Sequence, residues 1–178
     1  SGISGLVAVN SLMAMIGGVI VALLVSKNDP GFIHNGALAG LVAICAGSDK
    51  VHPLGALIIG GLAGLIFVKG FTWEQEKLKI DDVLGVWPLH GICGSWGGVA
   101  CGIFGQEALG GMGGVSILGQ IIGSVVAIVI ALFSGFIVYK TLDTLFGIRL
   151  DAEEELKGSD LAIHSLEAYP EDISSRFG

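Results

Sequence analysis

The sequence predicts an all-α protein that is integral to a membrane, and two features of its composition carry this prediction. Of the 178 residues, 52% are hydrophobic and only 14% are charged, whereas soluble domains usually carry about a quarter charged residues. The 30 glycines stand inside long runs of Val, Ile, Leu and Ala, as in membrane helices, where small residues let backbones approach closely. Because so few charges cannot coat a water-soluble domain, a lipid bilayer is the expected solvent.

Five segments are apolar enough to form membrane helices, each of which needs about 20 largely apolar residues. The second segment is short, and it follows the run Asn28-Asp29-Pro30-Gly31, which we interpret as a helix breaker. The fifth is the longest, so it should be tilted or extend into water. The predicted segments cover residues 3–25, 35–47, 54–69, 83–104 and 115–146, within a transmembrane region 1–150 that is followed by a tail, 151–178.

Glycines spaced four residues apart predict where these helices approach one another. Such pairs lie on one helix face and leave room for a second backbone. We also expect Asn10 and Asn35, polar residues in or beside the first two segments, to form hydrogen bonds between helices. The glycine pairs are Gly36/Gly40, Gly60/Gly64 and Gly119/Gly123.

The distribution of Lys and Arg predicts the orientation in the membrane. With five spans, Lys50 falls on one side, and the other eight of the nine cationic residues fall on the opposite side. Cationic residues favour the cytoplasmic side, so we expect a multi-pass cell-membrane protein with a cytoplasmic C-terminus. The start at Ser1 has no Met, basic region or cleavage site, and we interpret the chain as a fragment of a longer protein.

His90 is the most informative residue, because it stands in the middle of an uncharged predicted span. An ionisable side chain in a membrane segment normally faces a cavity or a partner. Helical spacing places Gly94, Gly98 and Gly102 in one row with it, and Val86 continues that row one turn earlier. Imidazole suits the passage of a small weak base, because it donates and accepts hydrogen bonds and changes protonation near physiological pH. The alternative is a core histidine that is bonded to a backbone carbonyl.

Asp81 and Asp82 precede the fourth span, where a carboxylate caps free N–H groups and suits the positive end of the helix dipole. We therefore expect Asp82 to be a helix cap rather than a ligand for a cation. Pro88, inside the predicted helix, should remove one backbone hydrogen bond and kink it.

Several functions find no support in the residues. The three cysteines lie in apolar runs and lack the spacing of metal ligands, so neither a disulfide framework nor a metal site is expected. We find no nucleophile–base pair, phosphate loop or nucleic-acid motif, and therefore predict no enzyme, no cofactor and no nucleic-acid partner. The acidic tail permits two interpretations, a solvated end or a regulatory docking segment.

Taken together, several stretches resemble the Amt/MEP/Rh ammonium transporters. Residues 35–44 (NGALAGLVAI) and 54–60 (LGALIIG) are similar to two of the family's helical segments. The most diagnostic run, 79–94, contains an Asp-Asp pair followed by HGICG. In the tail, residues 147–160 and 164–169 resemble the family's closing motifs. The matches keep the family's order and span nearly the whole chain.

The resemblance implies an all-α fold in which this chain forms the second half, helices seven to eleven, of an eleven-helix inverted-repeat protomer, assembled as a homotrimer. It implies ammonium or ammonia transport through a hydrophobic pore, and hence a role in nitrogen metabolism. His90 would be the second of two paired pore histidines in the proton path, with Val86 as its pore-lining neighbour. Asp82 would match a carboxylate at the start of that helix.

The resemblance also implies that the tail can bind a PII-type signalling protein. The positions that match the family's tail are Gly158, Asp160, His164 and Tyr169. Departures from the family pattern occur at Gly85, where many members carry Asp, at Trp87-Pro88, and in the tail at Ser159, Ser165 and Leu166. Two other functions remain open: an Amt-like sensor of ammonium, and a structural helical subunit of a larger membrane complex in which His90 is a packing residue.

Overall fold

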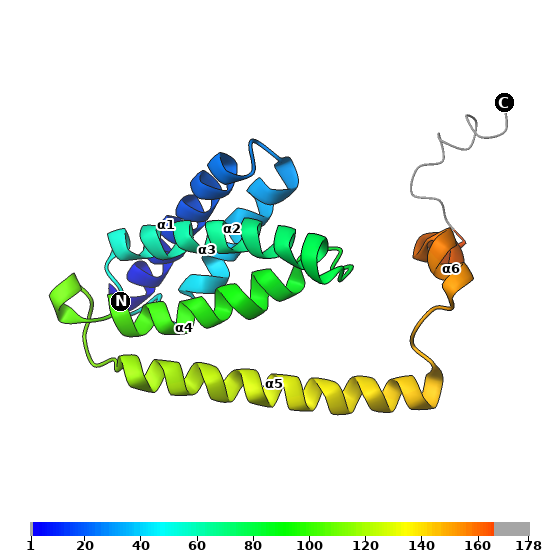
Figure 1. The fold of residues 1–178 in the computed structure, drawn as a ribbon. Helices are drawn as coiled ribbons and strands as arrows, with labels where there is room; N and C mark the ends of the chain where they lie inside the picture. The colour runs from blue at the N-terminus through cyan, green and yellow to red at the C-terminus, as the bar shows by residue number, and fades with distance from the viewer. Residues whose placement is uncertain (1, 166–178) are drawn as a thin grey trace. The chain divides into compact units, whose positions relative to one another are not determined.

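The computed structural model describes residues 2–165, and all regular secondary structure in that range is helical. The chain divides into two compact units, Ser1–Val129 and Ile130–Gly178. Five α-helices make up most of the described chain (Figure 1): α1 (Gly2–Val25), α2 (Pro30–Ile44), α3 (Pro53–Trp73), α4 (Cys93–Phe104) and α5 (Ile117–Phe146). Among residues 2–165, three helical stretches are long and apolar enough to cross a membrane, namely Gly2–Val25, Pro53–Leu78 and Ile117–Phe146. The prediction of an all-α membrane fold is confirmed.

Capping residues decide where α2 and α3 begin. Asp29 accepts a hydrogen bond from the Phe32 N–H (3.1 Å), and Pro30 is the first residue of α2. His52 caps α3 in the same way, ahead of Pro53. The sequence interpretation placed the start of the second segment at residue 35, because it took Pro30 for a breaker. Proline suits the first helical position, where its missing N–H costs nothing, so the helix begins five residues earlier.

Close backbone contacts hold α1, α2 and α3 together. A Cβ added to Gly40 or to Gly60 would collide with the Ala14 carbonyl, and one added to Gly36 or Gly64 would collide with the Gly18 backbone. One face of α1 therefore packs against a glycine pair from each of two other helices. A larger residue at these positions would hold the backbones apart, because its Cβ would occupy the space of the neighbouring helix. Such close packing stabilises membrane helices, since lipid gives apolar side chains no reason to pair.

The third glycine pair does not behave as predicted. Among the described residues, a Cβ on Gly123 would have no heavy atom within 4 Å, and one on Gly119 would meet only the side chain of nearby Ser116. Along α5 no residue is buried in the described chain. The prediction that this pair packs against a neighbouring helix is wrong for the described residues.

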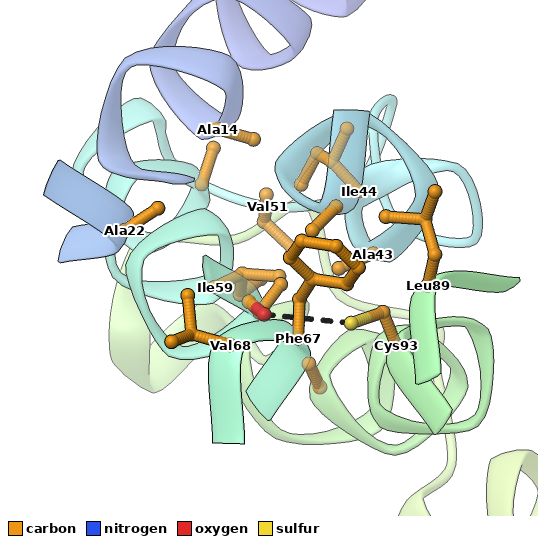
Figure 2. Packing of buried hydrophobic residues seen from close by; sticks show 14 residues of the cluster. Ala14, Ala22, Ala43, Ile44, Val51, Ile59, Phe67, Val68, Leu89 and Cys93 are labelled. Carbon is orange, nitrogen blue, oxygen red and sulfur yellow. Dashed lines mark hydrogen bonds between the residues drawn. The ribbon is translucent and has the colours of Figure 1, made fainter. Parts of the chain in front are cut away.

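Small and medium apolar side chains from α1 to α4 form the core (Figure 2). Phe67 is its largest member and is only 2% exposed. The Cys93 thiol donates to the Ala63 carbonyl of α3 (3.4 Å), which links the start of α4 to α3. Asn10, which is fully buried, donates to the carbonyls of Ser48 and Val51, at 2.8 Å each. These bonds end on the turn before α3, so Asn10 ties α1 to that turn and not to a second helix. Asn35 donates to the Gly31 carbonyl of its own helix, α2 (3.0 Å), so the expectation of a bond between helices is wrong for Asn35.

Two short helices follow α5 in the second unit, α6 (Ala152–Lys157) and α7 (Ser159–His164). Asp151 and Glu154 form a capping box at the start of α6, which satisfies two free N–H groups of a short helix. Gly158 separates the two helices with a φ of +91°. Asp160 lies in the first turn of α7, which ends at His164. Tyr169 lies outside the described residues.

Candidate functional site

His90 lies in a π-helical turn, η2 (Trp87–Ile92), that leads directly into α4. Turns of this kind are rare and are frequent at functional sites. Pro88 occupies one of the first two positions of η2, where its missing N–H is tolerated. The prediction that Pro88 lies in the interior of a helix is therefore wrong, because it lies at the beginning of the helical stretch.

His90 and its neighbours face two directions. His90 and Val86 are exposed in the described chain, whereas Pro88 and Leu89, which lie between them in sequence, are buried. Leu89 is 3% exposed and belongs to the core. Leu89 thus anchors the turn to α2 and α3, while the imidazole and the Val86 side chain point away from the core.

The glycine row that continues from His90 lies against other helices. A Cβ on Gly94 would lie 3.8 Å from Val42 Cγ1, and one on Gly102 would lie 2.8 Å from the Ile117 Cα at the start of α5. A Cβ on Gly98 would collide with Ser124 Oγ. Further along α4 the row is therefore filled by helix packing, and its open end is the turn that carries His90.

Asp82 holds the beginning of this turn. Its Oδ1 accepts from the Val86 N–H (2.9 Å), and its Oδ2 accepts from the Trp87 N–H (2.8 Å). Partial burial by itself raises the pKa of the Asp82 carboxyl. Hydrogen bonds from the backbone N–H groups of Trp87 and Val86, joined by those of Gly85 and Leu84, outweigh burial and hold this pKa below its ordinary value. The carboxylate is ionised at neutral pH and neutralises the positive end of the helix.

Gly85 makes a contact that the sequence did not reveal. It has a φ of +68°, and a Cβ there would lie 2.9 Å from Phe67 Cε2 and would collide with the Phe71 ring. Those two rings and Phe32 form a cluster with centroid distances of 5.5 to 5.9 Å. A glycine at this position has a structural reason, because a side chain at residue 85 would require the rings of this aromatic cluster to shift.

The end of α3 also contacts the turn. The Trp73 and Trp87 rings have centroids 6.1 Å apart, and both are about half exposed, at 48% and 44%. Gln75, in the π-turn η1 (Glu74–Leu78), donates to the Asp82 carbonyl (3.4 Å). In residues 2–165 no cluster of three His, Cys, Asp or Glu side chains could hold a metal ion. His90 therefore lies in a turn that is capped by Asp82 and contacted by the Trp73 ring, and its imidazole is on the exposed side of that turn.

Comparison with known proteins identifies the family. The family described as Ammonium Transporter Family matches residues 1–169. This chain belongs to that family. Among ammonium transporters from Methanocaldococcus jannaschii, Amt2 is 48% identical over 171 residues and Amt1 is 43% identical over 166 residues. A solved structure named Sensor Amt Protein superimposes with a TM-score of 0.78 at 29% identity.

These alignments cover most of this chain but less than half of each relative. They include 96% and 93% of the chain against the two transporters, and 92% against the solved structure. The chain spans 40% and 42% of the length of the transporters and 42% of the solved chain. The family resemblance that the sequence motifs indicated is confirmed.

Proposed function

We propose that this chain forms one wall of the conduction pathway of an ammonium transporter, with His90 on the lumen and in the proton path. The observation that carries the proposal is the orientation of the η2 turn, which buries Leu89 and exposes His90 beside Val86. Within an ammonium transporter family member, an imidazole on the outer side of an apolar helix is placed to face a lumen.

The chemistry follows from the cost of desolvation. Moving a bare ammonium ion through an apolar lumen carries a large penalty, whereas neutral ammonia avoids most of it. An imidazole can accept a hydrogen bond from ammonia at one ring nitrogen and donate one at the other. It can also take up or release a proton near physiological pH. Val86 supplies apolar surface next to the ring, so His90 is the polar group at this level of the exposed face.

The proposal extends to orientation and assembly. The cationic residues of the sequence favour a cytoplasmic C-terminus in the cell membrane, and the family resemblance favours a homotrimer. We propose that the tail docks a PII-type signalling protein through Gly158, Asp160, His164 and Tyr169. The capping box of α6 supports an ordered start to that tail, because capping stabilises a helix that is too short to persist alone.

The test is ammonium-driven current in proteoliposomes that contain the full-length protein, compared with His90→Ala. His34→Ala is the matched control, because His34 is also an exposed histidine, on α2. We expect wild type and the control to pass equal current and His90→Ala to lose current or ion selectivity. Equal current from all three proteins refutes the role of His90. Tight ammonium binding without any current in wild type would favour a sensor, as the name of the superimposed structure suggests for that protein.

A further inference from the structure

A hollow at the C-terminal end of α5 brings apolar and basic side chains together, and it lies wholly within the second unit. Its volume is about 420 Å³. On α5, Phe136 lies one helical turn before Lys140, and Tyr139 lies beside Lys140. The loop after the helix completes the lining with Ile148 and Arg149. The hollow therefore combines apolar surface with two cations.

The position of this hollow along α5 matches the surface of a bilayer. The helix is long and apolar enough to cross a membrane, and residues 117–139 contain no Asp, Glu, Lys or Arg. At 1.5 Å per residue this stretch measures about 35 Å, against about 30 Å for the hydrocarbon core of a bilayer. Tyr139 and Lys140 therefore lie at the level of the lipid head groups, where aromatic and cationic side chains are favoured. Phe136, one turn earlier, lies at the level of the acyl chains.

Both cations have an acidic partner but retain hydrogen-bond donors. Lys140 Nζ lies 3.2 Å from Asp143 Oδ2, and Arg149 Nη2 donates to the two Glu155 carboxylate oxygens at 3.1 and 3.4 Å. These contacts use one nitrogen of the guanidinium group and one proton of the ammonium group, so donors are left on both side chains. All four side chains are at least 43% exposed, and ion pairs this exposed contribute little to stability. An added anion can therefore share both cations.

The charge of the lining favours an anion as the ligand. Lys140 and Arg149 line the hollow together with a single acid, Asp143, whereas Glu155 lies outside the lining. Lysine binds phosphate as a point charge, and the arginine guanidinium binds it through parallel N–H groups. A free phosphate would leave the Phe136 ring, which is 69% exposed, without a contact. A phospholipid supplies an apolar chain for this ring and a phosphate for the cations.

We propose that this hollow binds an anionic phospholipid of the leaflet at which α5 ends. Lys140 and Arg149 hold the phosphate, and an acyl chain packs against Phe136. In the orientation proposed above this leaflet is the cytoplasmic one, whose anionic lipids attract basic side chains. The bound lipid fixes the depth at which α5 leaves the membrane. The inference goes beyond transport and does not depend on the role of His90.

The first experiment measures lipid binding to the full-length protein in detergent by native mass spectrometry, with dioleoyl phosphatidylglycerol as the probe. Lys140→Gln and Arg149→Gln should each weaken binding about fivefold, which corresponds to about 1 kcal/mol of attraction per cation near an anionic surface. Lys157→Gln is the matched control, because Lys157 is an exposed cation of α6 outside the lining. We expect it to bind like wild type. Equal binding by all four proteins, or an equal loss in the control, overturns the inference.

A second experiment fills the apolar part of the hollow. Gly135 lines it, and a Cβ there would meet nothing within 4 Å among the described residues. Gly135→Leu should therefore occupy the place of the acyl chain and weaken binding of the phospholipid. Gly123→Leu is the matched control on the same helix, because a Cβ at Gly123 is equally unobstructed in the described chain. Equal binding by the two variants refutes the acyl-chain contact, and if Gly135→Leu does not fold, the Lys140 and Arg149 variants decide.

Two further probes identify the source of the phosphate. Dioleoyl phosphatidylcholine carries no net charge and should bind more weakly than dioleoyl phosphatidylglycerol. Glycerol 3-phosphate, which has the phosphate but no acyl chain, should leave the unfolding temperature unchanged at concentrations where phosphatidylglycerol raises it. Equal binding of the two lipids overturns the selection of an anionic head group. An equal rise with glycerol 3-phosphate means that the hollow takes free phosphate and overturns the assignment to a lipid.

Discussion

Replacement of Gly85 by Ala tests the contact between the loop and the aromatic cluster. Gly85 has a φ of +68°, and an L-residue in the left-handed region costs about 1–2 kcal/mol. The new Cβ would also lie 2.9 Å from Phe67 Cε2 and closer still to Phe71, and overpacking of this kind costs about 1–3 kcal/mol. We therefore expect Gly85→Ala to lower the free energy of unfolding by about 2–5 kcal/mol in total.

A matched control separates the two contributions. Gly114 has a similar φ of +71°, but a Cβ there would have nothing within 4 Å among the described residues. Gly114→Ala should therefore show the backbone cost alone, about 1–2 kcal/mol. The assay is denaturant unfolding of the full-length protein in detergent, followed by tryptophan fluorescence.

The difference between the two variants is the packing cost at the ring cluster. If Gly85→Ala costs no more than Gly114→Ala, the Gly85–Phe71 contact does not limit residue 85 and the reasoning is refuted. A double-mutant cycle with Phe71→Ala gives a second check. Because removal of the ring makes room for the added methyl group, the two substitutions should couple by about 0.5–3 kcal/mol.

Two further substitutions test the helix cap and the glycine packing. Asp82→Ala should lower the free energy of unfolding by about 0.5–2 kcal/mol at neutral pH. Because the pKa of Asp82 is lowered in the folded state, its contribution is present above about pH 4 and disappears as pH falls through the lowered pKa. Urea titrations of wild type and variant should therefore converge in acid. Gly60→Ala, whose Cβ would collide with the Ala14 backbone, should destabilise the protein far more than Gly123→Ala, whose Cβ would meet nothing within 4 Å among the described residues. Equal unfolding midpoints for those two variants would contradict the close approach of α1 and α3.

Local patterns in the sequence were sufficient for the helices and for part of the packing. Glycines four residues apart identified the contacts of Gly36/Gly40 and Gly60/Gly64, because helical spacing places such pairs on one face. Among the described residues the same rule identified no contact at Gly119/Gly123, since it specifies a helix face but not what lies against it. The role of Pro30 was predicted wrongly for a similar reason. A proline can begin a helix or end one, and at Pro30 the hydrogen bond from Phe32 N–H to the Asp29 side chain shows that it begins α2.

The membrane class, the helical fold and the family could be predicted from the amino-acid sequence, because hydropathy, glycine content and ordered motifs are local properties of the chain. It also identified His90 as an ionisable residue in an apolar stretch. Three features are visible only in the folded chain: His90 lies in a π-turn with Leu89 facing the core, a Cβ at Gly85 would collide with the Phe71 ring, and Glu74 is buried while Glu76 is exposed. Glu74 and Glu76 are chemically identical and two residues apart, so no local rule separates them. Their difference comes from the loop that folds back over the end of α3, and such long-range contacts are formed only when the whole chain packs.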